Sequence, residues 1–320
     1  MALKRILFIT SNRLGDAVLS TGVLAHLLER YPGARITVVC GPVPAGLFAG
    51  VPGLERMIEM PKRKHSLHWW DMWRGCVLTL WDVVVDLRNA PLSYALPSLR
   101  QIHLGKANKK YTHRVVALAS LVDRADNPPA PQLWTGPEHE AQASELIVDG
   151  PPVLAVGPTA NWIGKTWAPE RFAELALRLV SDDGILPGGR IAVIAHRSEA
   201  EMARPVLQAL PKGRTLNLVG ETALLSIAAC LQRSRFYIGN DSGLMHMAAA
   251  VGTPTLGLFG PSREEHYAPW GQNGRAVRGE KSYDEVFPDD YDYRNTPSLM
   301  GNLSVDQAER AARDLWSQVS

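Results

Sequence analysis

The chain has 320 residues, more than one hydrophobic core usually organises, so we expect two domains of about 150 residues each. A hydrophobic fraction of 46% and a charged fraction of 21% are ordinary for a globular protein and exclude a disordered or low-complexity chain. The net charge of +2 is too small to indicate nucleic-acid binding, and no apolar run approaches the roughly 20 residues that a membrane-spanning helix needs.

The first residues place positive charge before a short apolar run, an order that signal peptides share. The run breaks at Ser11-Asn12-Arg13, too early for the apolar region of a signal peptide. We therefore predict a buried first strand and a cytoplasmic protein. The three cysteines are scattered and lack metal-site spacing, so they predict buried thiols rather than a disulfide framework or a zinc site.

Short β-branched segments alternate with amphipathic segments along the whole chain, a pattern typical of parallel sheets with crossover helices. The strands predicted in the first part are residues 5–10, 35–40, 56–59, 83–87 and 100–104. Those in the second part are residues 153–156, 190–195, 215–218, 236–239 and 255–259. The sequence therefore predicts two Rossmann-like sheets in series.

A proline-rich segment at residues 126–131 cannot continue a helix and indicates a linker. It sets the predicted domains at residues 1–130 and 131–320. The last amphipathic segment, residues 305–319, could fold back on the first domain.

The first strand leads into Ser11-Asn12-Arg13-Leu14-Gly15-Asp16, and residues 17–30 have helical periodicity. Open α/β sheets bind ligands at such strand ends. The G-x-G-x-x-G fingerprint is absent, which disfavours an NAD enzyme. Taken alone, Asp16 is interpreted as the N-cap of the helix, a position that aspartate favours.

A second polar turn follows the strand near residue 155. Gly157-Pro158-Thr159 and Lys165-Thr166-Trp167 together offer hydroxyl, amide and ammonium donors before a helix that opens at Pro169. Such a set suits a diphosphate, to which Lys165 would present a point charge. The alternative is a solvated loop lysine.

The most specific segment is a strand followed by Asn240-Asp241-Ser242-Gly243 and a helix that carries His246. Free N–H groups and the helix dipole at such a turn create an anion site. Ser242 and His246 are four residues apart and share one helix face. In the alternative interpretation Asp241 only caps the helix and His246 is a core histidine.

Three motifs together resemble one family. Arg13-x-Gly15-Asp16, Lys165-x-Trp167 and Asp241-Ser242-Gly243-x-x-His246 make the chain similar to the lipopolysaccharide heptosyltransferases of glycosyltransferase family nine. The similarity runs from about residue 4 to about residue 315 and includes residues 81–87, 258–262 and 300–305. It implies an α/β fold of the GT-B type, with two Rossmann-like domains whose parallel sheets face a central cleft. The amino-terminal domain would bind the acceptor and the carboxyl-terminal domain the nucleotide sugar.

The resemblance also implies roles for single residues. Asp16 would be the catalytic base of an inverting transfer that needs neither a cofactor nor a metal. The donor would be a nucleotide sugar, ADP-heptose, and the acceptor a lipopolysaccharide core or a related glycan. Residues implied for the donor diphosphate are Thr159, Lys165, Asp241, Ser242, Gly243 and His246, and those for the nucleoside are Arg197 and Glu199.

The sequence departs from the family at two places. Gly157-Pro158-Thr159 inverts the expected Pro-Gly order, and cysteines common near the family's carboxyl end are missing from residues 283–300. The second departure suggests a different acceptor.

An anionic acceptor fits the charge distribution. Residues 1–150 hold 17 Lys and Arg against 13 Asp and Glu, whereas the remaining residues hold 17 against 19. The densest basic cluster surrounds a predicted strand-to-helix turn, where a solvated helix start is the alternative to a phosphate-binding site. Residues predicted to bind an anionic glycan or glycolipid acceptor are Arg13, Lys109, Lys110 and Arg114.

Two further segments have both a functional and a structural interpretation. Asp290-Tyr291-Asp292 matches a metal-binding motif of another glycosyltransferase class, but it lies in an acidic loop without a preceding strand, so no metal is predicted. Residues 67–73 contain three tryptophans after a basic run. They are either a helix with inward tryptophans or a patch that rests peripherally on the anionic inner membrane.

Two other functions stay open at this stage. A GT-B-like epimerase, or an enzyme with a different donor, would share the fold and the diphosphate site. A non-catalytic protein would bind the nucleotide sugar without turnover.

Overall fold

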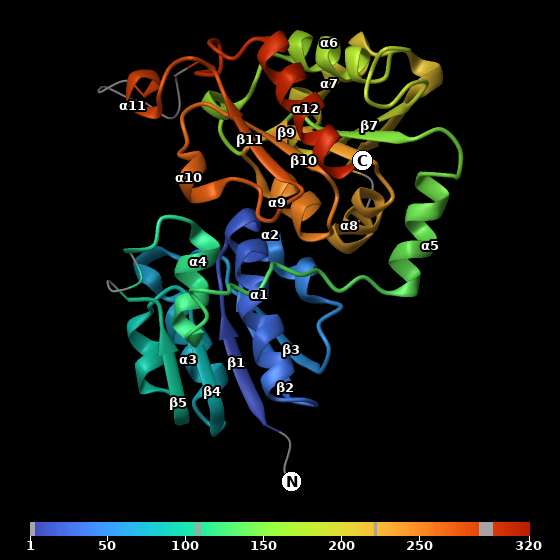
Figure 1. Ribbon diagram of the computed structural model, residues 1–320. Coiled ribbons are helices and arrows are strands. Elements are labelled where there is room, and N and C mark those ends of the chain that lie inside the picture. Colours follow the sequence, from blue (N-terminus) through green and yellow to red (C-terminus); the bar gives the residue numbers. More distant parts are fainter. Residues whose placement is uncertain (1–3, 106–107, 109, 221–222, 288–296) are drawn as a thin grey trace. The chain divides into compact units, whose positions relative to one another are not determined.

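The computed structural model describes residues 4–105, 108, 110–220, 223–287 and 297–320, and it divides into two compact units, Met1–Gly136 and Pro137–Ser320. Each unit is an α/β structure around one parallel sheet, and the two are described separately (Figure 1).

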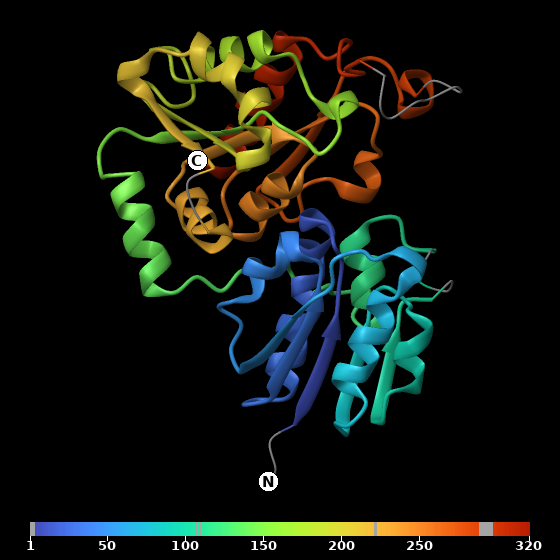
Figure 2. The same ribbon diagram turned by 180° about the vertical axis from the view of Figure 1, so that it is seen from behind.

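The sheet of the first unit has the order β3-β2-β1-β4-β5, and all its neighbouring strands are parallel. Its strands are β1 (Arg5–Ile9), β2 (Arg35–Cys40), β3 (Leu54–Glu59), β4 (Trp81–Asp86) and β5 (Ser98–His103). Helices α1 (Leu14–Arg30) and α4 (Arg114–Ala119) cover one face and α3 (His68–Cys76) the other, while α2 (Pro42–Ala45) is a single turn (Figures 1 and 2). Because helices cover both faces, β1 and β2 are almost continuously apolar and buried.

The sheet of the second unit has the order β11-β10-β9-β6-β7-β8, again all parallel. Its strands are β6 (Val153–Gly157), β7 (Arg190–Ala195), β8 (Thr215–Val219), β9 (Phe236–Asn240), β10 (Thr255–Phe259) and β11 (Gly274–Arg278). Its helices are α5 (Pro137–Leu146), α6 (Pro169–Leu179), α7 (Ala200–Ala209), α8 (Leu224–Gln232), α9 (Gly243–Ala250), α10 (Glu264–Tyr267), α11 (Tyr283–Val286) and α12 (Val305–Val319).

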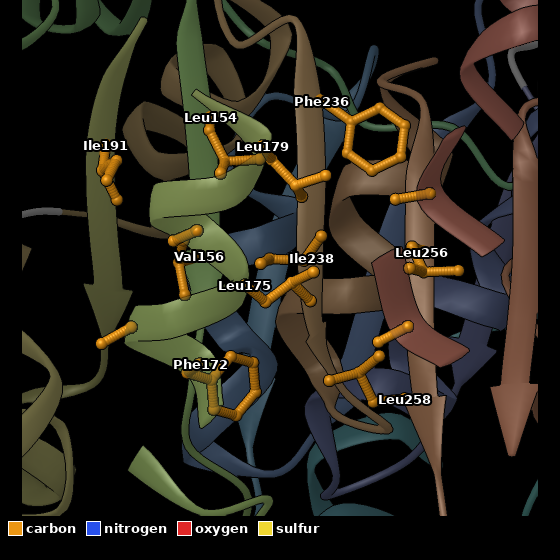
Figure 3. Packing of buried hydrophobic residues seen from close by; sticks show 14 of the residues in the cluster. Leu154, Val156, Phe172, Leu175, Leu179, Ile191, Phe236, Ile238, Leu256 and Leu258 are labelled. Atoms are coloured by element: carbon orange, nitrogen blue, oxygen red, sulfur yellow. The ribbon is translucent and has the colours of Figure 1, made fainter. Parts of the chain in front are cut away.

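The core of the second unit lies between its sheet and helices α6, α7 and α12. Helix α6 opens with Pro169 at its first position, a residue whose missing N–H costs nothing there. It then places Phe172, Leu175 and Leu179 at helical spacing against Val156 and Ile238 of the sheet (Figure 3).

Helix α12 packs against α6, β10 and β11 of the second unit. Arg178 of α6 is held there by Asp306 and Glu309 of α12, at N–O distances of 2.7 and 2.9 Å. The sequence suggested that this helix could return to the first domain. In the structure the apolar face of α12, including Ala308 and Leu315, is part of the core of the second unit.

All ten predicted strands are present, with shifts at some ends, and the three cysteines are buried as predicted. Strand β11 was not predicted. No helix among the described residues is long and apolar enough to cross a membrane. The same residues contain no cluster of three or more His, Cys, Asp or Glu that could hold a metal ion, and residues 290–292 lie outside them.

The packing of α6 predicts a contrast between two leucines on one helix. Leu175 is completely buried, whereas 39% of Leu177 is exposed. We expect Leu175→Ala to reduce the free energy of unfolding of the second unit by about 2–5 kcal/mol. Leu177→Ala should cost about 1 kcal/mol or less. Urea denaturation measures both, and equal losses would contradict the packing described.

Candidate functional site

The first candidate site is a pocket of the first unit at the carboxyl ends of β1 and β4. The strand order reverses between these neighbours, which is where open α/β sheets bind ligands. The pocket has a volume of about 220 Å³. Its lining residues are Thr10, Ser11, Asp16, Ser20, Leu87, Arg88, Arg114 and Leu118. One carboxylate and two guanidinium groups therefore share one small polar pocket.

Asp16 lies in the first turn of α1, and Arg13 is the N-cap of that helix. The interpretation of Asp16 as the N-cap is therefore wrong, because the helix begins at Leu14, earlier than its apolar periodicity indicates. Within the described ranges, no group hydrogen-bonds to the Asp16 carboxylate. The carboxylate is half-buried and available to a ligand in the pocket.

Arg88 was not predicted from the sequence. Its guanidinium donates to Asn12 Oδ1 at 2.5 Å and lies 4.8 Å from the centroid of the Trp69 ring. Burial lowers the pKa of Arg88, and the charge of Asp86 partly offsets this effect. A guanidinium that is held in place and partly stripped of water interacts strongly with an anion.

Asp86 fixes the turn that carries Arg88. It is the last residue of β4, is completely buried, and accepts hydrogen bonds from the backbone N–H groups of Arg88 (2.8 Å) and Ala90 (2.7 Å). The hydroxyl of Ser93 donates to it as well, at 2.7 Å. The backbone conformation that positions Arg88 therefore depends on the buried Asp86 carboxylate.

Of the predicted acceptor-binding residues that the structure describes, Arg114 alone lines the pocket. It opens α4, and its Nε atom is buried without a hydrogen-bond partner in the described part of the chain. Arg13 and Lys110 are exposed and do not line the pocket, and Lys109 lies outside the described residues. The pocket therefore combines Arg114 with Arg88.

The tryptophan-rich segment forms α3. Trp69 and Trp73 pack against the core on that face, as the structural interpretation predicts. Trp70 is 48% exposed and stacks on Trp73, with ring centroids 5.0 Å apart. Contact of this segment with a membrane stays a prediction.

The second candidate site is in the second unit, at the carboxyl ends of β6 and β9. The strand order reverses between these two strands as well. Asn240, the buried last residue of β9, donates to the carbonyl of Pro158 at 2.8 Å and accepts from the N–H of Trp167 at 3.1 Å. These bonds attach the loop after β6 to the turn after β9.

Lys165 and Asp241 form an ion pair across these two segments. The Nζ–Oδ2 distance is 2.5 Å, and the two side chains are 22% and 7% exposed. His246 is buried with Nε2 at 3.9 Å from the other Asp241 oxygen. Asp241 therefore holds Lys165 in place, and the interpretation of Lys165 as a solvated loop lysine is wrong.

Ser242 is the N-cap of α9, so the interpretation of Asp241 as the cap is wrong. The Ser242 side chain makes none of the capping hydrogen bonds that a serine usually makes at this position. The N–H groups of the first turn, beginning at Gly243, can therefore bind an anion, and the helix dipole favours it.

Thr159, which follows β6, contacts Glu199, which follows β7. The buried Thr159 hydroxyl donates to Glu199 Oε2 at 2.7 Å, and the same oxygen accepts the N–H of His196 at 3.4 Å. Arg197 is exposed two residues before Glu199. Thr159 is therefore hydrogen-bonded to Glu199, one of the two residues predicted to bind the nucleoside. That these residues bind the donor stays a prediction.

Comparison with known proteins gives the class and the family. The profile of glycosyltransferase family 9 (heptosyltransferase) matches residues 87–288. Lipooligosaccharide heptosyltransferase 2 of Haemophilus influenzae is 26% identical over 85% of this chain and 88% of its own length. Lipopolysaccharide heptosyltransferase 2 of Salmonella typhimurium is 27% identical over 88% of this chain and 90% of its own length.

Solved structures agree on the fold. A family 9 glycosyl transferase from Veillonella parvula has a TM-score of 0.79 at 21% identity, and the Escherichia coli ADP-heptose heptosyltransferase II has a TM-score of 0.74 at 21% identity. Each comparison covers 99% of both chains. The α/β fold of the GT-B type is thereby confirmed, and the protein is a glycosyltransferase. The chain belongs to glycosyltransferase family 9, the heptosyltransferases.

The geometry of the first site predicts that substitutions of two aspartates reduce the stability of the protein by different amounts. Asp16→Asn should reduce the free energy of unfolding by about 1 kcal/mol or less, because Asp16 is not the N-cap of α1 and its carboxylate makes no hydrogen bond within the described residues. Asp86→Asn should cost about 2 kcal/mol or more, because an amide cannot accept all three buried bonds. Urea denaturation measures both. If Asp16→Asn reduced the free energy of unfolding as much as Asp86→Asn, Asp16 would have a structural role.

Proposed function

We propose that this protein transfers heptose from ADP-heptose to a lipopolysaccharide core or a related anionic glycan, with inversion at the anomeric carbon and without a metal. The names of the family 9 relatives support the sugar and the class of acceptor. The solved Escherichia coli protein is named for ADP-heptose, which supports the donor.

The first unit binds the acceptor in this proposal. The observation that carries it is the pocket in which the Asp16 carboxylate, which has no hydrogen-bond partner in the described part of the chain, lies with Arg88 and Arg114. Two guanidinium groups suit a phosphate or carboxylate group on the acceptor, and the carboxylate can receive the proton of an acceptor hydroxyl.

In the transfer step, the acceptor oxygen attacks the anomeric carbon and its proton passes to Asp16. The bond between the anomeric carbon and the diphosphate oxygen breaks, and ADP leaves with the electron pair. Among the described residues no group hydrogen-bonds to the Asp16 carboxylate, so its oxygens are available to the acceptor hydroxyl.

The second unit binds the donor. Its nucleoside diphosphate gains negative charge as the glycosidic bond breaks, so groups that bind it stabilise the transition state. Lys165 and the first turn of α9 from Ser242 supply positive charge and N–H donors for this purpose. These groups can perform the role that a divalent metal has in other glycosyltransferases, which supports a metal-independent reaction.

The catalytic role of Asp16 gives a direct test. An amide cannot accept the proton, so Asp16→Asn should reduce kcat by about 10²- to 10⁴-fold. The affinity for ADP, measured by calorimetry, should stay unchanged because the donor binds to the second unit. Glu29→Gln is the matched control, since Glu29 is an exposed carboxylate at the end of the same helix. A near-normal rate for Asp16→Asn would remove the general base from the proposal.

The arginines of the pocket give a second test. We expect Arg88→Gln to raise KM for the acceptor by about tenfold, the effect of losing one charged hydrogen bond of about 1.5 kcal/mol. KM for the donor should stay unchanged. Arg74→Gln, which removes an exposed arginine of the same unit, is the control and should change neither constant. An unchanged acceptor KM for Arg88→Gln would exclude Arg88 from acceptor binding.

A further inference from the structure

Tyr237 is a completely buried tyrosine on β9, the strand that leads into the proposed diphosphate site. Its sequence neighbours Phe236 and Ile238 belong to the core that packs against α6 and α12. Side chains alternate along a strand, so Tyr237 points to the opposite face. Met245 of α9 covers that face. Its sulfur lies so close to Gly257, the residue of β10 that pairs with Gly239 of β9, that a Cβ at Gly257 would overlap it.

Two glycines leave room for the phenol to reach the carboxyl edge of the sheet. Gly239 follows Tyr237 by two positions on the same strand and pairs with Gly157, the last residue of β6. A Cβ at either glycine would overlap the Tyr237 hydroxyl. The hydroxyl oxygen therefore lies over the last residues of β6 and β9, next to the turn at which α9 begins.

Two hydroxyl groups at this turn lack partners. The Tyr237 hydroxyl and Ser242 Oγ are both inaccessible to water, and neither has a hydrogen-bond partner among the residues that the structure describes. Burial raises the pKa of Tyr237, and the nearby Ser242 side chain lowers it by less. The phenol is therefore a neutral hydrogen-bond donor at physiological pH. Buried polar groups without partners are rare in proteins and call for an explanation.

We propose that Tyr237 is a positioning residue of the donor site, which acts through Ser242. When an anion binds at the first turn of α9, the phenol donates to Ser242 Oγ and the Ser242 hydroxyl donates to a phosphate oxygen. Each hydrogen bond strengthens the other by polarisation. The inference rests on the proposed function, because it takes the diphosphate of the donor as the anion.

Calorimetry with the full chain tests this relay. Tyr237→Phe should weaken ADP binding by about 3- to 10-fold, the effect of one hydrogen bond, and leave adenosine binding unchanged. In a Ser242→Ala background, Tyr237→Phe should change ADP affinity less than about twofold, because the relay is already broken. The melting temperature of the ligand-free Tyr237→Phe protein should stay the same or rise, because the variant removes a buried hydroxyl without a partner.

Several results would overturn the inference. Unchanged ADP affinity for Tyr237→Phe, equal losses for ADP and adenosine, or fully additive losses in the double variant would each exclude the relay. A lower melting temperature with normal ADP affinity would assign Tyr237 a structural role only. If the unaltered protein binds no ADP, UDP, GDP or CDP, the proposed function fails and the inference fails with it.

Discussion

In each unit, one of the two strands at which the strand order reverses ends in a completely buried polar side chain. The candidate site beside that strand depends on the hydrogen bonds that this side chain must make. Asp86 ends β4 and Asn240 ends β9. A buried carboxylate or amide must be satisfied internally, since water cannot reach it. The loops that satisfy them carry Arg88 in the first unit and Lys165 in the second. The same requirement thus fixes one cationic residue in each site.

The two sites differ in how their charges are balanced. In the second unit, Lys165 is paired with Asp241, so the site has little net charge in its side chains, and the N–H groups of α9 remain for an anion. In the first unit, the charged side chains that line the pocket are two arginines and one carboxylate, and that carboxylate has no hydrogen-bond partner among the described residues, so the lining has one excess positive charge. This difference supports a donor that is held mainly by oriented dipoles and an acceptor that is held by charge.

The sequence predicted the buried parts of the fold well, because parallel strands covered on both faces are uniformly apolar. Strand β11 is a half-exposed edge strand that contains Arg275 and Arg278, and Arg278 is held by Glu264 of α10, so its sequence lacks the apolar pattern of the other strands. The cap of α1 was misplaced because Gly15 and Asp16, in the first turn of the helix, add no apolar signal. Arg88 could not be found, because its side chain is held by Asn12, which is 76 residues away in the sequence and comes next to it only in the folded sheet.

The central claim is that the protein transfers a heptose from an ADP-linked donor. The most direct measurement is mass spectrometry and NMR of the products formed from ADP-heptose and a heptose-free lipopolysaccharide core in the presence of EDTA. The account predicts an acceptor with one added heptose, free ADP, and an inverted anomeric configuration. An unmodified acceptor with an epimerised nucleotide sugar, a retained configuration, or a reaction that proceeds only after a divalent metal is restored would contradict it.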